Sequence, residues 1–359
     1  MNELEEYADQ VPLRPKGQPR TLRYHSTAGA RPMAAGRIIL VGIIAFTLAG
    51  LFNADSLHAQ ASRQPYGWKR NVLLDLVGPM RWVSHTTRLN RPHADIQRAI
   101  GRPPIEGSPS TVVVTTRPAS APPPAIVLPR PSRARPLTLW VGGDSMVQEF
   151  GTSVLEKASD LGTFKATLDY HISTGLTRPD YFDWPAHLQS DVLPTKPQVM
   201  VIMFGANDSQ SLEIPDGGPV YKPDSPTWQA EYRKRVARTM DQVAGNGRLV
   251  VWVGVPNMRD PGFNTRMQAL DVIYRSEAAK RPWIRFLDSR PLLAPKGGGY
   301  AAYLPNAEGE PTLARQSDGI HLSRYGADIV ADAVYRLIDK EIVLANRHRP
   351  STTTSTTKP

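Results

Sequence analysis

The sequence predicts an α/β domain over residues 137–346, in which a mostly parallel β-sheet is covered by helices on both faces. Short apolar runs typical of buried strands alternate along this segment with longer runs of helical periodicity. Such alternation gives a parallel sheet, because each helix carries the chain back to the edge at which the next strand begins. Three short polar blocks lie at the ends of these elements. Ligands of parallel sheets bind at the carboxyl ends of the strands, so the blocks mark the expected site.

The apolar runs predict five strands, and the amphipathic runs between them predict four helices. The expected strands are 137–141, 164–172, 199–204, 249–255 and 284–287. The expected helices are 146–159, 228–243, 264–280 and 323–342, the last with Ser323 as its N-cap. The run at 199–204 is Val-Met-Val-Ile-Met-Phe, which is typical of a strand buried on both faces.

The composition fits a folded protein and excludes several kinds of site. The chain has 359 residues, of which 40% are hydrophobic and 21% are charged. That length is enough for about two domains, and those fractions are ordinary for a packed core. The chain contains no cysteine. Disulfides, thiolate metal sites, iron–sulfur clusters and cysteine nucleophiles are therefore excluded.

The net charge of +10 is unevenly distributed along the chain. Residues 1–136 carry 18 basic and 8 acidic side chains, whereas residues 137–359 carry 25 of each. The basic excess therefore lies outside the expected domain. Because no recognition-helix or aromatic-stacking pattern accompanies it, we expect no nucleic-acid partner.

An apolar segment near the N-terminus predicts a membrane anchor. It follows a polar tail at residues 1–32, and residues 38–52 carry no charge. Extended to 33–54, the segment reaches the roughly 20 residues that a transmembrane helix needs, with Arg37 able to reach the interface. This signal-anchor would leave the domain outside the cytoplasm, in the periplasm or the extracellular space. A cleaved signal peptide, with a cleavage-like Ala-Gln-Ala at 59–61, and a buried helix of a soluble domain remain as alternatives.

The segments that flank the domain differ in character. Residues 55–101 predict a membrane-proximal stalk of helical pieces, which Pro79 and Pro92 should separate. An amphipathic helix there would rest on anionic lipid or dock a partner, and a plain stalk helix is the alternative. Residues 102–136 contain ten prolines, which predicts a disordered linker. Residues 347–359 form a Thr/Ser-rich tail without structural signal.

The three polar blocks contain the groups that acyl-transfer chemistry requires. They are residues 143–146 (Gly-Asp-Ser-Met), 205–208 (Gly-Ala-Asn-Asp) and 318–321 (Asp-Gly-Ile-His). A nucleophilic serine needs a base, and the base needs an orienting group. His321 has Asp318 three residues before it, so this pair fits the two roles. An asparagine at a neighbouring strand end offers an amide to an oxyanion.

These blocks resemble those of the SGNH (GDSL-type) hydrolase superfamily, which comprises esterases, lipases, polysaccharide deacetylases and O-acyltransferases. The resemblance implies a flavodoxin-like three-layer αβα sandwich. It implies that Ser145 is the nucleophile and that Asp318 and His321 complete the triad. It also implies an oxyanion hole made by the backbone N–H groups of Ser145 and a glycine, best placed at Gly175, and by the side chain of Asn207.

The resemblance covers residues 137–342, outside the N-terminal third. Residues 174–185 together with 204–208 are also similar to a bacterial, membrane-anchored SGNH subfamily of undefined function. Two departures occur: Met146 replaces the usual leucine, and the glycine after the serine comes later, at Gly151. Neither departure removes a catalytic group.

The sequence therefore predicts a membrane-tethered serine esterase or O-acyltransferase that acts on an envelope or exported glycan, or on a lipid ester. The alternative is a catalytically inactive SGNH-type protein with a binding or assembly role. No Gly-x-Ser-x-Gly, Walker-type or dinucleotide motif occurs, and we expect no cofactor.

Other polar residues have open interpretations. Asp180, Asp183 and His187 are either a metal cluster or part of a structured loop, and we expect no metal. Arg178 and Arg259 are candidates for contacts with a polar substrate. The aromatic residues at 181–184 either line a substrate pocket or pack beside the site.

Overall fold

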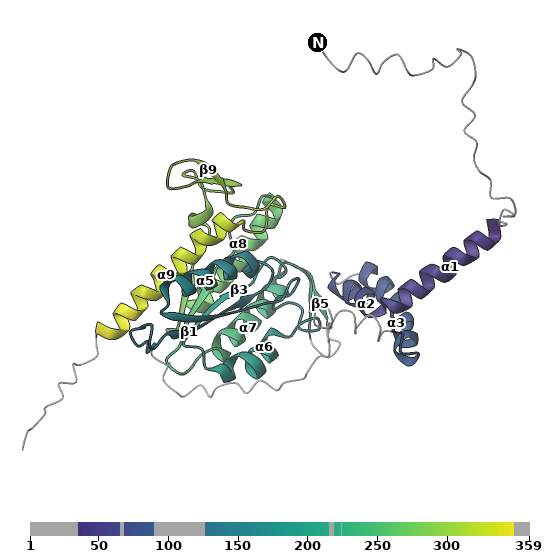
Figure 1. The fold of residues 1–359 in the computed structure, drawn as a ribbon, viewed down its shortest axis with the longest axis horizontal. Coiled ribbons are helices and arrows are strands. Elements are labelled where there is room, and N and C mark those ends of the chain that lie inside the picture. The colour runs from purple at the N-terminus through teal and green to yellow at the C-terminus, as the bar shows by residue number, and fades with distance from the viewer. Residues whose placement is uncertain (1–34, 65–67, 90–125, 215–218, 224, 348–359) are drawn as a thin grey trace, which may run out of the picture. The chain divides into compact units, whose positions relative to one another are not determined.

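The structure is a computed structural model that describes residues 35–64, 68–89, 126–214, 219–223 and 225–347 (Figure 1). The expected polar tail, Pro92, most of the expected linker and nearly all of the C-terminal tail lie outside these residues. The chain divides into two compact units, residues 1–50 and 51–359.

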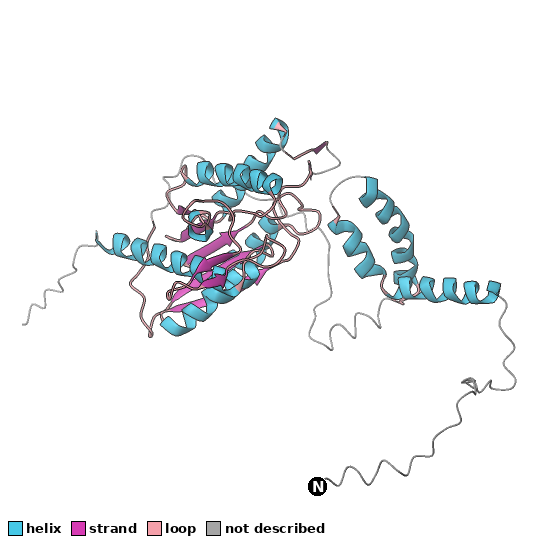
Figure 2. Ribbon diagram, turned by 90° about the horizontal axis from the view of Figure 1, so that it is seen from above, coloured by secondary structure: helices cyan, strands magenta, loops and turns pink. Residues whose placement is uncertain are grey.

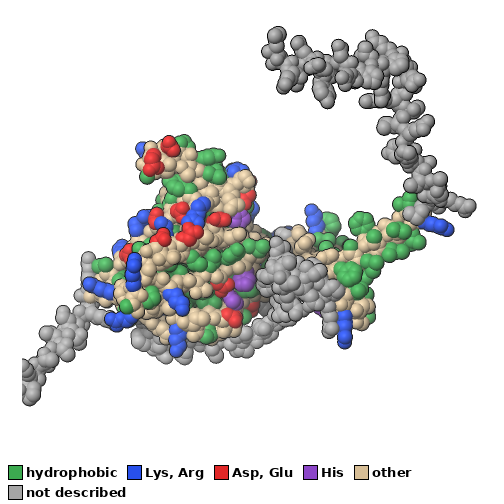
Figure 3. All heavy atoms as spheres, in the orientation of Figure 1, with side chains coloured by type: hydrophobic (Ala, Val, Ile, Leu, Met, Phe, Trp, Pro, Cys, Tyr) green, Lys and Arg blue, Asp and Glu red, His purple; other side chains and the backbone are tan. Residues whose placement is uncertain are grey.

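Helix α1 (Ala35–Phe52) is an apolar helix whose large side chains are exposed. Figure 3 shows these hydrophobic side chains in green along the helix, and Phe46 alone is 82% exposed. Within the described ranges, no single helix is both long and apolar enough to cross a membrane, although 36–52 and 54–62, separated by a bend, pass that test as a pair.

Helices α2 (Ala54–Arg63) and α3 (Trp68–Thr86) pack against one another. The Asp55 carboxylate accepts hydrogen bonds from Arg81 at 2.9 Å and from His85 at 2.7 Å. The expected helix break at Pro79 is wrong, because α3 continues through this residue. A proline inside a helix removes one hydrogen bond, and burial of Val77 and Ser84 on either side helps to offset that loss.

The second unit contains a five-stranded sheet in which every neighbouring pair is parallel. Its order is β2-β1-β3-β6-β7, the flavodoxin-like order. The strands are β1 (Leu137–Gly143), β2 (Phe164–Tyr170), β3 (Val199–Met203), β6 (Leu249–Val253) and β7 (Ile284–Leu287). The predicted strands and their parallel arrangement are confirmed, with ends shifted by at most two residues.

Helices cover both faces of this sheet, as Figure 2 shows around the magenta strands. They are α5 (Val147–Leu161), α6 (Trp184–His187), α7 (Pro226–Gln242), α8 (Pro261–Ala278) and α9 (Arg324–Arg347). Helices α5 and α9 pack together, and Tyr335 donates to the Val154 carbonyl oxygen at 2.9 Å. Helices α7 and α8 pack together, and Arg233 donates to the Glu277 carboxylate at 3.1 Å. The predicted three-layer α/β architecture is confirmed.

Burial along the strands explains why the apolar runs in the sequence predicted them correctly. Every residue of β3 and β6 is buried, whereas the edge strands β2 and β7 are only partly buried. A strand buried on both faces needs an uninterrupted apolar run, and both central strands have one. Ser323 precedes α9 and accepts from the Gly326 N–H at 3.4 Å, so the predicted N-cap is confirmed.

Further features differ from the expectation. Two short hairpins, β4 (Leu212–Glu213) with β5 (Val220–Tyr221) and β8 (Tyr303–Pro305) with β9 (Pro311–Leu313), are too short to leave a periodic signal. Residues 126–136, expected as linker, pack on the domain instead: Leu128 is 2% exposed and its carbonyl accepts from Asn346 at 3.0 Å. Burying such a leucine contributes about 2 kcal/mol, which helps to offset the conformational entropy lost when this proline-containing segment is ordered.

Candidate active site

Ser145 lies in the turn between β1 and α5, at the switch point where β1 has β2 on one side and β3 on the other. Gly143, with φ of +150°, lets the two central strand ends approach closely. A Cβ atom there would lie 1.9 Å from the carbonyl oxygen of Met203 on β3. The glycine of this block is therefore required by the backbone, and it brings the serine to the edge of the sheet.

Asp144 links the ends of β1 and β3 by hydrogen bonds. No role was predicted for it from the sequence. Its buried carboxylate accepts from the N–H of Met146 at 2.9 Å and from the N–H of Gly205 at 3.0 Å. Burial raises the pKa of Asp144 to about 7, although both N–H groups favour the ionised form. The acid next to the serine thus positions the first two blocks against each other.

The first and third blocks meet in an unbroken chain of hydrogen bonds. Ser145 Oγ lies 2.8 Å from His321 Nε2, and His321 Nδ1 lies 2.6 Å from Asp318 Oδ2. The His321 side chain is 31% exposed and that of Asp318 40%, so the chain is accessible from solvent. This arrangement can hold the imidazole with Nδ1 protonated and Nε2 facing the hydroxyl, which is what activation of a serine requires.

Hydrogen bonds keep Asp318 in its ionised form. Partial burial acts to raise its pKa, but the His321 ring and the backbone N–H groups of Ile320 and His321 outweigh burial and lower the pKa below its ordinary value. Both N–H groups bond to Oδ1, at 2.8 and 3.0 Å, which leaves Oδ2 for the imidazole. The carboxylate is thus charged and fixed in orientation.

Two arginines hold the backbone of this third block. Arg315 is fully buried and donates to the carbonyl oxygens of Asn257 and Ile320. Arg259 donates to the Ser317 carbonyl at 2.8 Å. Arg259 therefore supports the turn, and its interpretation as a substrate contact stays a prediction. Arg315 was missed, because nothing in its local sequence signals burial.

Asn207 follows β3, and its side-chain amide nitrogen is available to donate a hydrogen bond. Its Nδ2 atom is buried and has no hydrogen-bond partner in the described part of the chain. The backbone carbonyl of the same residue accepts from Gln210 at 2.7 Å, which fixes the turn. A buried donor without a partner costs free energy, and donation to a bound ligand would recover that cost.

Gly175 lies in a loop that packs against the Asp208 carboxylate and is hydrogen-bonded to it. A Cβ atom at Gly175 would lie 2.2 Å from the Asp208 carboxylate, so only glycine fits this close approach. Asp208 is fully buried and accepts from Thr177 N–H at 2.9 Å and from the Tyr232 hydroxyl at 2.6 Å. Burial raises the pKa of Asp208. The last residue of the second block therefore carries the loop that contains Gly175.

Other sequence candidates lie elsewhere. Arg178 is buried and donates to Asp180 at 2.8 Å and to the backbone carbonyl of Gln64 at 3.1 Å, so it is a structural contact. Trp184 is fully buried, and its ring centroid lies 5.1 Å from that of Phe204. Ordinary packing is therefore the role of this aromatic residue.

Asp180, Asp183 and His187 are not brought together. Asp180 pairs with Arg178 and with Arg70, and Asp183 caps α6 by accepting from Ala186 N–H at 3.0 Å. His187 lies 2.7 Å from a different carboxylate, Asp169. The interpretation of the first three as one metal cluster is wrong.

Comparison with known proteins identifies a family. The family model described as "Protein of unknown function (DUF459)" matches residues 138–337, while no curated protein matches the chain.

Similar solved structures share low sequence identity with this chain. A lipase/acylhydrolase from Enterococcus faecalis is 18% identical, with a TM-score of 0.41 over 57% of this chain and 96% of that one. A GDSL-like lipase from Bacteroides thetaiotaomicron is 14% identical, with a TM-score of 0.40 over 56% and 88%. A catalytic mutant of an acetylxylan esterase from Geobacillus stearothermophilus is 17% identical, with a TM-score of 0.37 over 57% and 94%.

The sheet order, the position of the first two polar blocks at the ends of β1 and β3, and that of the third block before α9 fit the SGNH hydrolase fold that the sequence resembles. The family match spans more than half of the chain and contains all three blocks. The chain therefore belongs to the DUF459 family.

Proposed function

We propose that this protein is a serine-dependent esterase or O-acyltransferase. The observation that carries the proposal is the chain of hydrogen bonds from Ser145 through His321 to Asp318, with separations of 2.8 and 2.6 Å. A nucleophile, a base and an orienting carboxylate in this order are the parts that acyl transfer through a covalent intermediate needs.

In the first half of the reaction, Ser145 Oγ attacks the ester carbonyl carbon while His321 Nε2 takes the hydroxyl proton. Asp318 stabilises the imidazolium that results. The tetrahedral intermediate then collapses: the bond from carbon to the alcohol oxygen breaks, and the imidazolium gives its proton to that oxygen. The acyl group remains as an ester of Ser145.

In the second half, the acceptor attacks the acyl carbon while His321 takes its proton. The bond from that carbon to Ser145 Oγ then breaks, and the imidazolium returns the proton to the serine. Water as acceptor gives a hydrolase, and a carbohydrate hydroxyl gives a transferase. We assign the oxyanion to the backbone N–H groups of Ser145 and Gly175 and to Asn207 Nδ2. The unpartnered state of that buried amide supports its assignment.

For the substrate, we propose an acyl ester on an envelope or exported glycan, with a lipid ester as the other class. The exposed apolar side chains of α1 support a membrane anchor, which would keep the enzyme at the cell surface. The activity itself is tested with the purified full chain on p-nitrophenyl acyl esters of graded length. Turnover that is fastest for acetyl supports the glycan class, and a preference for long chains favours lipid. A folded protein without turnover on any ester would support a binding or assembly role.

Asn207→Ala should lower kcat by about 10²–10³-fold with little change in KM. The amide would act on charge that exists only in the tetrahedral intermediate, so its loss affects the transition state more than the bound substrate. Initial rates on an aryl acetate measure both constants. The matched control is Gln210→Ala, which removes the bond to the Asn207 carbonyl but leaves the amide in place, and its kcat should stay within a few-fold. If Asn207→Ala instead has a lower melting temperature and a nearly unchanged kcat, Asn207 only stabilises the turn and is not part of the oxyanion hole.

The proposed topology predicts that a protease added to intact spheroplasts releases a soluble fragment of domain size. Cleavage should fall within residues 102–125, which the sequence predicts to be a linker, because the packed domain resists proteolysis. Immunoblotting with an antibody to the domain follows the release. Detergent-opened spheroplasts are the control, and protection that is lost only after opening would place the domain in the cytoplasm.

A further inference from the structure

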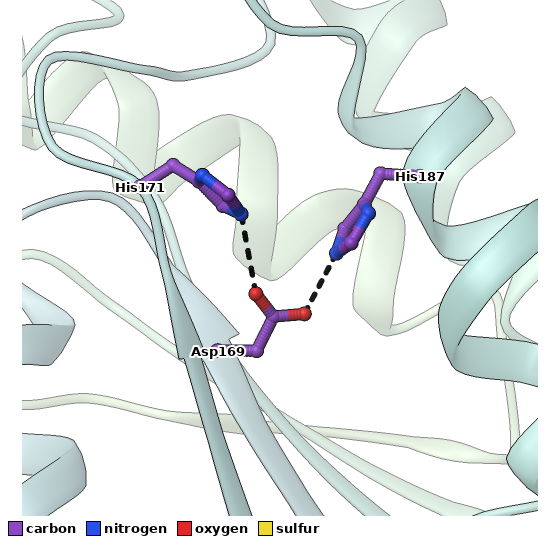
Figure 4. Close-up of side chains that lie close together, drawn as sticks. All are labelled: Asp169, His171 and His187. Atoms are coloured by element: carbon purple, nitrogen blue, oxygen red, sulfur yellow. Dashed lines mark hydrogen bonds and ion pairs between the residues drawn. The ribbon is translucent and has the colours of Figure 1, made fainter. Parts of the chain in front are cut away.

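A second cluster of polar side chains lies at the end of β2, and Figure 4 shows its geometry. The two carboxylate oxygens of Asp169 face two imidazoles: Oδ1 is 3.3 Å from His171 Nε2, and Oδ2 is 2.7 Å from His187 Nε2. The ligand atoms of the three side chains all lie within 4.8 Å of one another. Two nitrogens and one carboxylate thus converge on one small volume.

Secondary structure and packing fix these three groups before any ligand arrives. Asp169 lies in β2, and the backbone N–H of His171 continues the strand pairing by donating to Gly143 O at 3.0 Å. The His171 ring stacks on Phe182 at a centroid distance of 3.9 Å. His187 ends helix α6. Little side-chain entropy would therefore be lost on binding an ion.

We propose that Asp169, His171 and His187 bind a divalent transition-metal ion, with Zn²⁺ as the best fit. Neutral imidazole and carboxylate are ligands that zinc accepts, at about 2.0–2.2 Å, which separates tetrahedral ligand atoms by about 3.3 Å. The separation of 3.3 Å between Asp169 Oδ1 and His171 Nε2 already has that spacing, and the candidate ligand atoms all lie within 4.8 Å, so small side-chain rotations would complete the set. The proposed site shares only His187 with the three residues that the sequence left open as a metal cluster, and it departs from the expectation of no metal.

The surroundings of the cluster provide the outer contacts of a metal site. His187 Nδ1 lies 3.2 Å from Asp191, so a carboxylate orients this imidazole as it does in many zinc sites. Trp140 donates to Asp169 Oδ2 at 3.2 Å and orients the carboxylate. The His171 side chain is 39% exposed and the other two about half as much, which leaves an entry path and room for a fourth ligand such as water.

The test is a calorimetric titration of the purified, metal-free full chain with Zn²⁺. One ion should bind per chain, with a Kd in the micromolar range or below. His171→Ala and His187→Ala should each weaken binding by at least about 100-fold, and Asp191→Asn, which keeps all three ligands, by about 10–100-fold. His85→Ala is the matched control, because that histidine also contacts a carboxylate, Asp55, but belongs to no group of three converging candidate ligands among the described residues, and it should bind as wild type does.

A measurement on the unmodified chain covers the case in which a variant fails to fold. Co²⁺ added to the wild type should give visible ligand-field absorption that Zn²⁺ abolishes. Absence of both stoichiometric Zn²⁺ binding and the Co²⁺ spectrum would overturn the proposal, as would equal binding by the wild type and folded His171→Ala and His187→Ala variants. In either case the cluster would be a hydrogen-bonded contact only. Ser145→Ala should bind Zn²⁺ normally, so this outcome is independent of the proposed esterase activity.

Discussion

Ser145→Ala should lower kcat for ester hydrolysis by about 10⁶-fold, close to loss of measurable activity. Without the hydroxyl no acyl-enzyme can form, and the remaining groups only assist attack by water. The stability should change by no more than about 0.5 kcal/mol, because Ser145 is partly exposed and sits in a turn held by Asp144. Initial rates on an aryl acetate and a melting curve measure the two effects.

The matched control for this variant is Ser153→Ala. It deletes the same hydroxyl from helix α5, where the Ser153 Oγ is buried without a hydrogen-bond partner among the described residues. Its kcat should remain that of the wild type. A Ser145→Ala protein that turns over ester as fast as the Ser153→Ala protein would mean that the nucleophile lies elsewhere.

Asp318→Asn should lower kcat by about 10⁴-fold. The change keeps the size of the side chain, but an amide that faces His321 with its NH₂ group favours the imidazole tautomer that is protonated at Nε2. That tautomer cannot take the proton from Ser145, from which Nε2 is 2.8 Å away. KM should change little, since binding of the ester does not require the proton transfer.

Asp260→Asn is the control for this substitution. Asp260 is the N-cap of α8 and accepts from Phe263 N–H at 2.6 Å, and asparagine caps a helix equally well. Activity should therefore stay close to that of the wild type. If Asp318→Asn loses no more activity than Asp260→Asn, Asp318 acts only as a turn residue.

The sheet and the arrangement of the site were predictable because their signals are local. Strands β3 and β6 are continuous apolar runs, which only burial on both faces explains. The first two polar blocks follow β1 and β3, and a parallel sheet places the carboxyl ends of its strands on one edge. This rule placed Ser145 and Asn207 in the same region, whereas His321 follows the separate hairpin of β8 and β9 and was assigned through the family resemblance of its block.

The buried charged residues were not predictable, because a single sequence does not distinguish a buried charged residue from an exposed one. Asp144, Asp208 and Arg315 are each buried by contacts with segments far away in the chain. Local pattern carries no information on such contacts. The same limitation applies to the bond from Arg259 to the Ser317 carbonyl, which joins segments far apart in the chain.

The spacing of Asp169 and His171 in the sequence already indicated that these two residues lie together. Residues i and i+2 of a strand point to the same face, so the expected strand at 164–172 already placed Asp169 beside His171. His187 was instead grouped with Asp180 and Asp183, its neighbours in sequence. Those two carboxylates are taken by Arg178 and by the cap of α6, respectively.

The most direct test of the central claim, that Ser145 is an activated nucleophile, is covalent labelling of the full chain with a fluorophosphonate. The reagent is attacked by a serine oxygen, loses fluoride and remains as a stable phosphonate ester. Intact mass spectrometry followed by peptide mapping should show one adduct, located on Ser145, with much slower labelling of Asp318→Asn. A folded wild-type protein that gains no adduct, or that is labelled at another residue while Ser145 stays unmodified, would contradict the claim.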